Sequence, residues 1–107
     1  MRVIRRIAAV PAAVALLFAM PALAQAPTAV IVQNFSFQPP EITVSVGGAV
    51  QWTNRDGTRH QIESDDGKVA GPAMATQESF SFTFQTAGRV TYHCAIHPSM
   101  TGLVVVQ

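Results

Sequence analysis

Cysteine is almost absent from this sequence of 107 residues, which contains only Cys94. A single cysteine cannot form an internal disulfide, so a disulfide framework is excluded as a source of stability. A covalently attached haem is excluded as well, because the Cys-x-x-Cys-His attachment motif needs a second cysteine. Three roles remain open for Cys94: an intermolecular bridge, a reactive thiol, or a thiolate bound to a metal.

Charged residues are also scarce, at 12% of the sequence, and three of the basic ones lie within the first six positions. After Ala24 the chain holds four basic and six acidic side chains, which gives a formal charge of −2. No basic patch remains, so nucleic acid is not an expected partner.

No hydrophobic run is long enough to indicate a membrane span. The longest, residues 7–20, follows the N-terminal arginines and precedes an Ala-x-Ala site that ends at Ala24. This order is typical of a secretory signal peptide, although an uncleaved anchor is the alternative. We therefore expect residues 1–24 to be a signal peptide and residues 25–107 to form one exported, periplasmic domain, a monomer without membrane contact after cleavage.

The pattern after residue 24 is that of β-strands. Three phenylalanines (Phe80, Phe82 and Phe84) alternate with small polar residues, and no segment has the periodicity of an amphipathic helix. The expected strands cover residues 29–32, 34–37, 42–46, 50–53, 79–84, 90–94 and 103–106. The polar stretch 63–77 is expected to be an irregular loop. Short alternating runs between Gly, Pro and Asn turns predict an all-β antiparallel sandwich or barrel.

Three side chains that bind metals lie at the end of the strand expected at 90–94 and just after it, namely Cys94, His97 and Met100 in a Cys-x2-His-x2-Met arrangement. A loop that curls around one ion can bring all three together, but a protein site needs a further ligand from elsewhere. His60 is the candidate, because the connection that contains it can lie at the same end of a sandwich. His93 is expected to point away from Cys94, since side chains alternate along a strand.

This combination of residues favours copper. A thiolate, two imidazoles and a weak thioether suit an ion that changes between soft Cu(I) and borderline Cu(II). Zinc also accepts cysteine and histidine, but a thioether is a poor zinc ligand. Each residue taken alone has a structural explanation, such as a buried thiol, a core methionine or a surface histidine. Their joint occurrence predicts one bound copper.

The sequence resembles the cupredoxin (blue-copper) family, and within it the amicyanin and plastocyanin-like members. The resemblance covers nearly all of residues 30–106 and rests on the stretches Trp52–Asp56 before His60, Gly71–Met74, Phe80–Phe84 and Tyr92–Met100. It implies a Greek-key β-sandwich of about seven or eight strands, with copper held at one end by His60, Cys94 and His97 and with Met100 as axial ligand. It also implies that the backbone N–H of Gln61 donates to the Cys94 sulfur.

The expected function is electron transfer without catalytic turnover. A periplasmic type 1 copper protein would shuttle single electrons between redox partners, such as a c-type cytochrome or a periplasmic dehydrogenase. A periplasmic copper chaperone or buffer is the alternative, although such proteins are usually richer in methionine and histidine. A copper enzyme is not expected, because a second copper would need further histidines.

An apolar patch around the edge of His97 is the expected docking surface for these partners, because exposed apolar patches mark interaction sites. Its expected members are Ala95, Ile96, Pro98 and the 71–74 run, with Arg59 as the nearest charge.

Overall fold

The structure is a computed structural model that describes Val3 and residues 25–107. The expected signal peptide therefore lies, except for Val3, outside the described residues. The described residues form eight strands and no helix: β1 (Thr28–Gln33), β2 (Ser36–Gln38), β3 (Glu41–Val44), β4 (Ala49–Asn54), β5 (Ile62–Ser64), β6 (Ser79–Thr83), β7 (Gly88–Cys94) and β8 (Thr101–Val106). These residues accordingly contain no helix that could cross a membrane.

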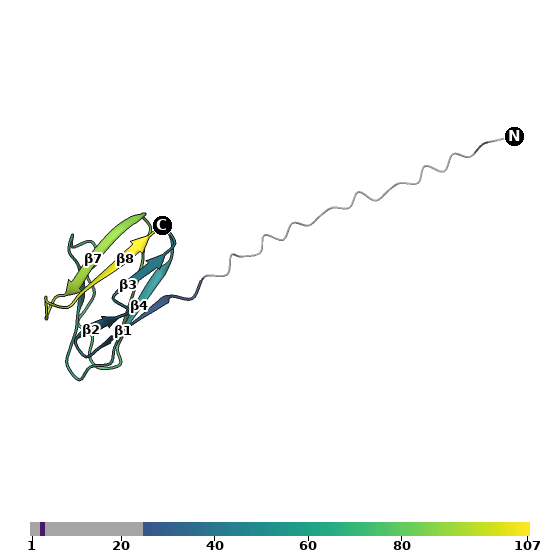
Figure 1. Cartoon of the computed structure of the whole chain (residues 1–107). Helices are drawn as coiled ribbons and strands as arrows, with labels where there is room; N and C mark the ends of the chain where they lie inside the picture. The colour runs from purple at the N-terminus through teal and green to yellow at the C-terminus, as the bar shows by residue number, and fades with distance from the viewer. Residues whose placement is uncertain (1–2, 4–24) are drawn as a thin grey trace.

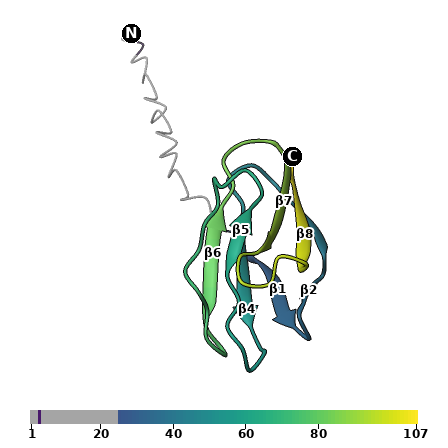
Figure 2. The same ribbon diagram turned by 90° about the vertical axis from the view of Figure 1, so that its left-hand side faces the viewer.

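The strands form two four-stranded sheets that pack face to face (Figures 1 and 2). The first sheet has the order β2-β1-β4-β6 and the second the order β3-β8-β7-β5. The all-β sandwich predicted from the sequence is confirmed. Two pairs, β1–β4 and β3–β8, are nevertheless parallel, whereas only antiparallel pairs were expected. They arise because the chain crosses to the second sheet at β3 and returns to the first at β4.

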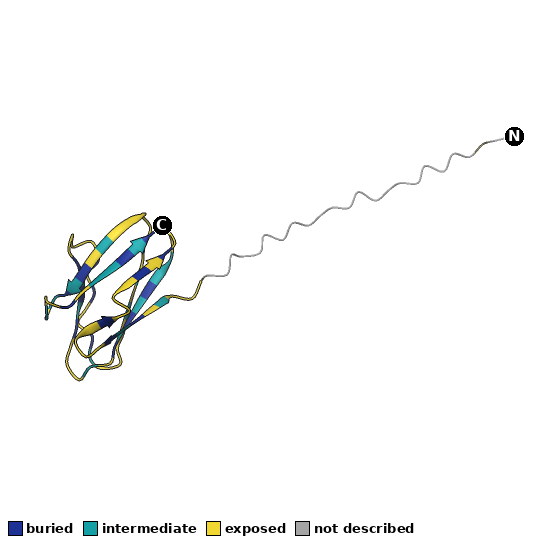
Figure 3. Ribbon diagram, viewed as in Figure 1, coloured by how far each residue is buried: buried dark blue, intermediate teal, exposed yellow. Residues whose placement is uncertain are grey.

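The core lies between the sheets and follows the alternation along the strands (Figure 3). In β4, Val50, Trp52 and Asn54 are buried while the residues between them are partly exposed. The Trp52 ring is 1% exposed and packs on Phe80 and Tyr92, with ring centroids 5.8 and 5.5 Å away. Aromatic side chains of this size contribute much of the apolar area that a small domain can bury.

Strand β5 was not predicted, because it lies partly within the stretch expected to be a loop. It pairs with β7, and Ile62 stands opposite Cys94 in the register. Two isolated bridges connect the rest of that stretch to earlier residues: Met74 pairs with His60, and Ala70 pairs with Glu63. Together β5 and the His60 bridge fix the backbone beside the end of β7.

Different residues lie at the two ends of the sandwich. Strands β4 and β7 run toward one end, and the loops that follow them carry His60 and His97. We call this the ligand end. At the far end, the backbone of Gln107 exchanges hydrogen bonds with Val44 and Val46. Strand β1 also starts at the far end, because Thr28 pairs with Val50 at the start of β4 (Figure 1).

Candidate metal centre

Three atoms that bind metals meet at the ligand end. Cys94 Sγ lies 3.7 Å from His60 Nδ1 and 3.9 Å from His97 Nδ1. The three residues form a group whose ligand atoms all lie within 4.8 Å of one another. Metal bonds of about 2.0 Å to nitrogen and about 2.3 Å to sulfur, at about 120°, would place N and S about 3.8 Å apart. The spacing therefore fits one ion bound by all three residues in a trigonal arrangement.

The backbone fixes the two buried members of this group. Cys94 ends β7, and His60 exchanges two backbone hydrogen bonds with Met74, of 3.2 and 2.7 Å. The side chains of Cys94 and His60 are both fully buried. Such immobile ligands need little rearrangement when the charge of the ion changes.

The loop from Cys94 to Met100 is closed by its own hydrogen bonds. The Cys94 amide donates to the Met100 carbonyl (3.0 Å), and the Met100 amide donates to the His97 carbonyl (2.9 Å). Met100 is 5% exposed and belongs to the core. His97 remains partly exposed. His60, Cys94 and His97 are thus together, with His97 as the member nearest the solvent, and Met100 closes the loop that carries two of them.

The Cys94 sulfur has a backbone neighbour, as the family resemblance implied. The amide of Gln61 donates a hydrogen bond of 3.4 Å to Sγ. The Ala95 amide donates in turn to the Gln61 carbonyl at 2.9 Å. Donors of this kind orient a metal ligand and tune its electron donation.

His93 lies on the opposite face of β7, as alternation predicted. Its Nδ1 is 2.7 Å from Asp65 and its Nε2 is 3.2 Å from Glu63. The hydrogen bond with Asp65, assisted by that with Glu63, raises the pKa of His93. Both ring nitrogens are engaged by carboxylates, so His93 is not a member of the ligand group.

Sequence reasoning missed Asp56 and Phe35. Asp56 Oδ2 lies 2.8 Å from His60 Nε2, on the side of the ring away from Cys94. Burial disfavours the charged carboxylate, but hydrogen bonds from Phe35, His60 and Asn34 outweigh this and lower the pKa of Asp56. The only available signal was an acidic residue four positions before His60.

Phe35 packs on both imidazoles. Its ring lies edge-to-face against His60 and His97, with centroids 5.3 and 5.1 Å away. The side chain is nevertheless 54% exposed. Phe35 therefore covers part of the ligand end and also forms part of its surface.

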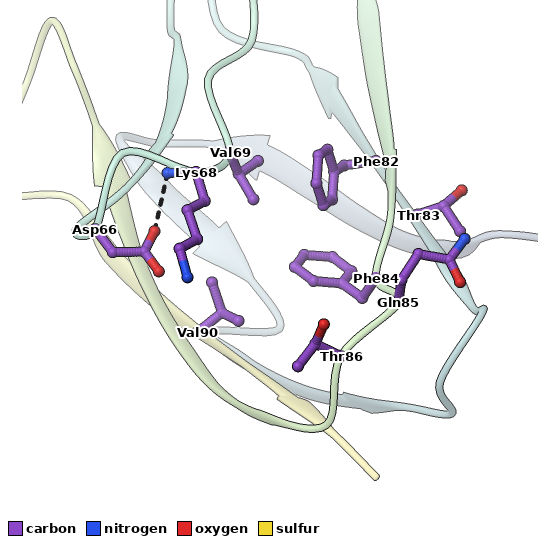
Figure 4. Close-up of a pocket in the computed structure, with 9 residues that line it drawn as sticks. All are labelled: Asp66, Lys68, Val69, Phe82, Thr83, Phe84, Gln85, Thr86 and Val90. Atoms are coloured by element: carbon purple, nitrogen blue, oxygen red, sulfur yellow. Dashed lines mark hydrogen bonds between the residues drawn. The ribbon is translucent and has the colours of Figure 1, made fainter.

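A separate apolar pocket of about 200 Å³ lies between β6 and the turn after β5 (Figure 4). It contains no residue of the ligand group. Its lining residues are Asp66, Lys68, Val69, Phe82, Thr83, Phe84, Gln85, Thr86 and Val90. The Lys68 amide donates to the Asp66 carboxylate at its rim.

Comparison with known proteins agrees with this geometry. The model of the cupredoxin-like domain family matches residues 6–106. Amicyanin from Paracoccus denitrificans is 35% identical over 95 residues, which are 84% of this chain and 72% of that protein. Amicyanin-alpha from Methylorubrum extorquens is 34% identical, covering 83% of this chain and 82% of the relative. Plastocyanin from Scenedesmus fuscus is 33% identical over 66% of this chain and 86% of its own.

Solved structures give the same result. The Cu(I) form of an amicyanin mutant superimposes with a TM-score of 0.73 at 34% identity, over 80% of this chain and 87% of that one. The fold, the ligand chemistry and the relatives agree on a blue-copper electron-transfer protein with one copper as cofactor, not an enzyme. The chain therefore belongs to the cupredoxin family.

Proposed function

We propose that this protein is a periplasmic carrier whose copper is bound by His60, Cys94, His97 and Met100 and which passes single electrons between redox partners. The observation that carries the proposal is the meeting of one cysteine sulfur and two imidazole nitrogens within 4.8 Å of one another. Copper at this position would store one electron as Cu(I) and release it as Cu(II).

The burial of the site supports a carrier over the alternative, a copper chaperone or buffer. A delivery protein needs exposed ligands that exchange copper readily. Here His60 and Cys94 are fully buried and Met100 is 5% exposed, so His97 is the most accessible of the four proposed ligands. Buried ligands of this kind favour retention of the ion while the electron is exchanged.

The surface around His97 supports docking of a redox protein, with one correction to the expected patch. Met74 is 1% exposed and packs in the core, so the prediction that it forms part of the docking surface was wrong. The expected members Ile96 (44% exposed) and Pro98 are exposed, and Phe35 (54% exposed), which packs on His97, is an unexpected addition to the patch. Redox encounters are typically small and short-lived, which suits a patch of a few exposed residues. A c-type cytochrome or a periplasmic dehydrogenase remains the proposed kind of partner.

The periplasmic location rests on the sequence of residues 1–24, which we propose to be the cleaved signal peptide of the domain 25–107. Strand β1 begins at Thr28, soon after the proposed cleavage at Ala24. Mass spectrometry of protein from a periplasmic fraction tests this directly. A mature chain that begins at Gln25 is expected, and a full-length chain found in the membrane fraction would contradict it.

The copper assignment is tested with purified residues 25–107. We expect one copper per chain and an intense blue or green colour from charge transfer between the Cys94 thiolate and Cu(II). Cys94→Ser should abolish the colour. A chain that takes up zinc but not copper would overturn the assignment. Rapid electron exchange with a c-type cytochrome, together with slow loss of copper to a chelator, would separate a carrier from a chaperone.

A further inference from the structure

Every polar atom of Asp56 is engaged in a hydrogen bond. Its amide donates to Asn54 Oδ1 (2.9 Å), and its carbonyl accepts from the Thr76 hydroxyl (2.7 Å). Carboxylate Oδ1 accepts from the Asn34 amide at 2.7 Å, and Oδ2 lies 2.9 Å from the Phe35 amide nitrogen and 2.8 Å from His60 Nε2. The carboxylate is therefore held in one place, because any displacement would break several bonds at once.

This placement determines which nitrogen of His60 carries the proton. An ionised carboxylate can only accept hydrogen bonds, so His60 Nε2 must carry the hydrogen that faces Asp56. In a neutral imidazole the lone pair is then on Nδ1, which faces Cys94 Sγ at 3.7 Å. A carboxylate on the far nitrogen also increases the electron donation of an imidazole to a metal.

The same carboxylate holds the tip of the β1–β2 hairpin. Asn34 and Phe35 have φ values of 53° and 54°, a left-handed conformation that residues other than glycine seldom adopt. Both of their amides donate to Asp56, which compensates for this backbone conformation. The Phe35 ring is thereby set against His60 and His97, at interplanar angles of 87° and 88°.

We propose that Asp56 is a positioning residue for the metal centre: its carboxylate orients the His60 imidazole and, through the hairpin tip, holds the Phe35 ring against both imidazoles. The inference rests on the proposed copper function and adds a residue that tunes it. Negative charge next to His60 stabilises Cu(II) more than Cu(I), so Asp56 lowers the reduction potential.

Asp56→Asn is the informative substitution, because it keeps the shape of the side chain and removes one acceptor. Three N–H groups share the two carboxylate oxygens. In either orientation of an Asn amide, at least one of these donors would face an NH2 group. Asp66→Asn is the matched control: the Asp66 carboxylate accepts from the Lys68 amide and the Ser64 hydroxyl in a turn but contacts no residue of the ligand group.

The first measurement uses the copper-free protein, in which 15N NMR reports the tautomer and the proton exchange of His60. In the wild type we expect hydrogen on Nε2 with slow exchange. Asp56→Asn should speed this exchange at least tenfold and shift the Phe35 amide and ring resonances, whereas Asp66→Asn should change neither. Wild-type exchange and wild-type Phe35 resonances in a folded Asp56→Asn protein would overturn the proposal.

The second measurement is the ratio of Cu(II) to Cu(I) affinity in the copper-loaded protein, obtained from the reduction potential. Loss of a partner of a metal-bound histidine commonly changes affinity by about 10- to 100-fold. Asp56→Asn should therefore weaken Cu(II) binding relative to Cu(I) by about tenfold or more, which raises the potential. Asp66→Asn should leave the ratio within about twofold. Equal ratios for the wild type and Asp56→Asn would contradict the tuning role.

If Asp56→Asn does not fold, Asp56→Glu becomes the test. It keeps the charge but lengthens the side chain by one methylene, so it must displace either the imidazole or the hairpin tip. We expect altered His60 or Phe35 resonances, and a folded variant with neither change would refute the inference. A colourless wild type would instead refute the copper function, while the NMR measurement would still decide the role of Asp56.

Discussion

The ring of Tyr92 occupies the space in which any residue other than glycine at position 102 would place its Cβ. A Cβ built on Gly102 would lie 2.3 Å from Tyr92 Cζ and 2.5 Å from its hydroxyl oxygen. The ring cannot swing away freely, because Phe37 and Trp52 pack on it with centroids 4.7 and 5.5 Å away. The phenol is buried without a hydrogen-bond partner among the described residues, and this burial raises the pKa of Tyr92 to about 12. β7 and β8 thus approach each other closely just before the ligand loop.

Gly102→Ala should consequently lower the free energy of unfolding by about 1–3 kcal/mol, the usual cost of overpacking a core. Denaturant unfolding of the copper-free protein measures it. The control is Gly57→Ala, where an added Cβ would meet nothing within 4 Å. The control should stay within about 0.5 kcal/mol of the wild type. Equal losses for both variants would show that the close contact with Tyr92 is not responsible.

The bond from the Gln61 amide to Cys94 Sγ should raise the reduction potential, because it stabilises negative charge on sulfur and so favours Cu(I). Gln61→Pro removes the N–H and should lower the potential. The corresponding change in the free energy of reduction should not exceed about 3 kcal/mol, because a hydrogen bond to a charged group contributes about 1.5–3 kcal/mol. Gln61→Ala keeps the amide and loses only the side-chain bond to the Gly71 carbonyl (2.9 Å), so its potential should stay near that of the wild type. A lower potential in the alanine variant would assign the effect to the side chain.

Met100 should act as a weak axial ligand whose softness favours Cu(I). Voltammetry should show a lower potential for Met100→Gln and a higher one for Met100→Leu. Met74→Leu is the control, because Met74 is also buried but lies outside the ligand loop. The assignment of Met100 as a ligand would be withdrawn if neither Met100 variant moved the potential further than the control.

His93 should make stability depend on pH. Its pKa is raised in the folded protein, chiefly by the hydrogen bond with Asp65, so the charged form stabilises the fold. This contribution is complete below the unfolded pKa of about 6.5 and is lost as the pH rises through the folded pKa. The stability advantage of the wild type over His93→Gln should therefore be larger at pH 5.5 than at pH 9. Unfolding of copper-free protein at both values measures it, and an advantage that grows with pH would contradict the assignment.

The docking surface is tested at Ile96, which is 44% exposed on the ligand loop. Ile96→Glu should slow electron transfer to a partner cytochrome several-fold while colour and potential stay nearly unchanged, because it adds a charge to an apolar contact. Val46→Glu introduces the same change at a residue that is 50% exposed near the far end. Stopped-flow rates should fall only for Ile96→Glu. A similar loss in both variants would indicate an effect of net charge, not of docking.

Local spacing made most of the ligand group predictable. Cys94, His97 and Met100 lie on one short loop, so their proximity follows from the sequence alone. His60 could be placed beside them for two reasons. Alternation indicated one strand before His60 and another before the Cys94 loop, and a sandwich has only two ends at which the loops after these strands can lie.

The parts that escaped prediction depend on contacts between distant segments. Asp56 and Asn34 are 22 positions apart, and neither residue carries a pattern that indicates a hairpin tip folded over a metal site. Strand β5 is only three residues long, and its pairing with β7 defines it more than its own sequence does. The parallel pairs were missed for a similar reason, because they depend on where the chain crosses between sheets.

The distance between the ligand end and the far end determines where the protein can be attached to a surface or to another protein. Gln107 and the start of β1 lie at the far end, and β8 spans six residues before it reaches Gln107. At about 3.3 Å per residue, this strand separates Gln107 from the ligand loop by about 20 Å. A tether at Gln107, whether to an electrode or to a fused enzyme, would be attached at the far end of the sandwich. It would leave the exposed edge of His97 free to contact a partner in solution.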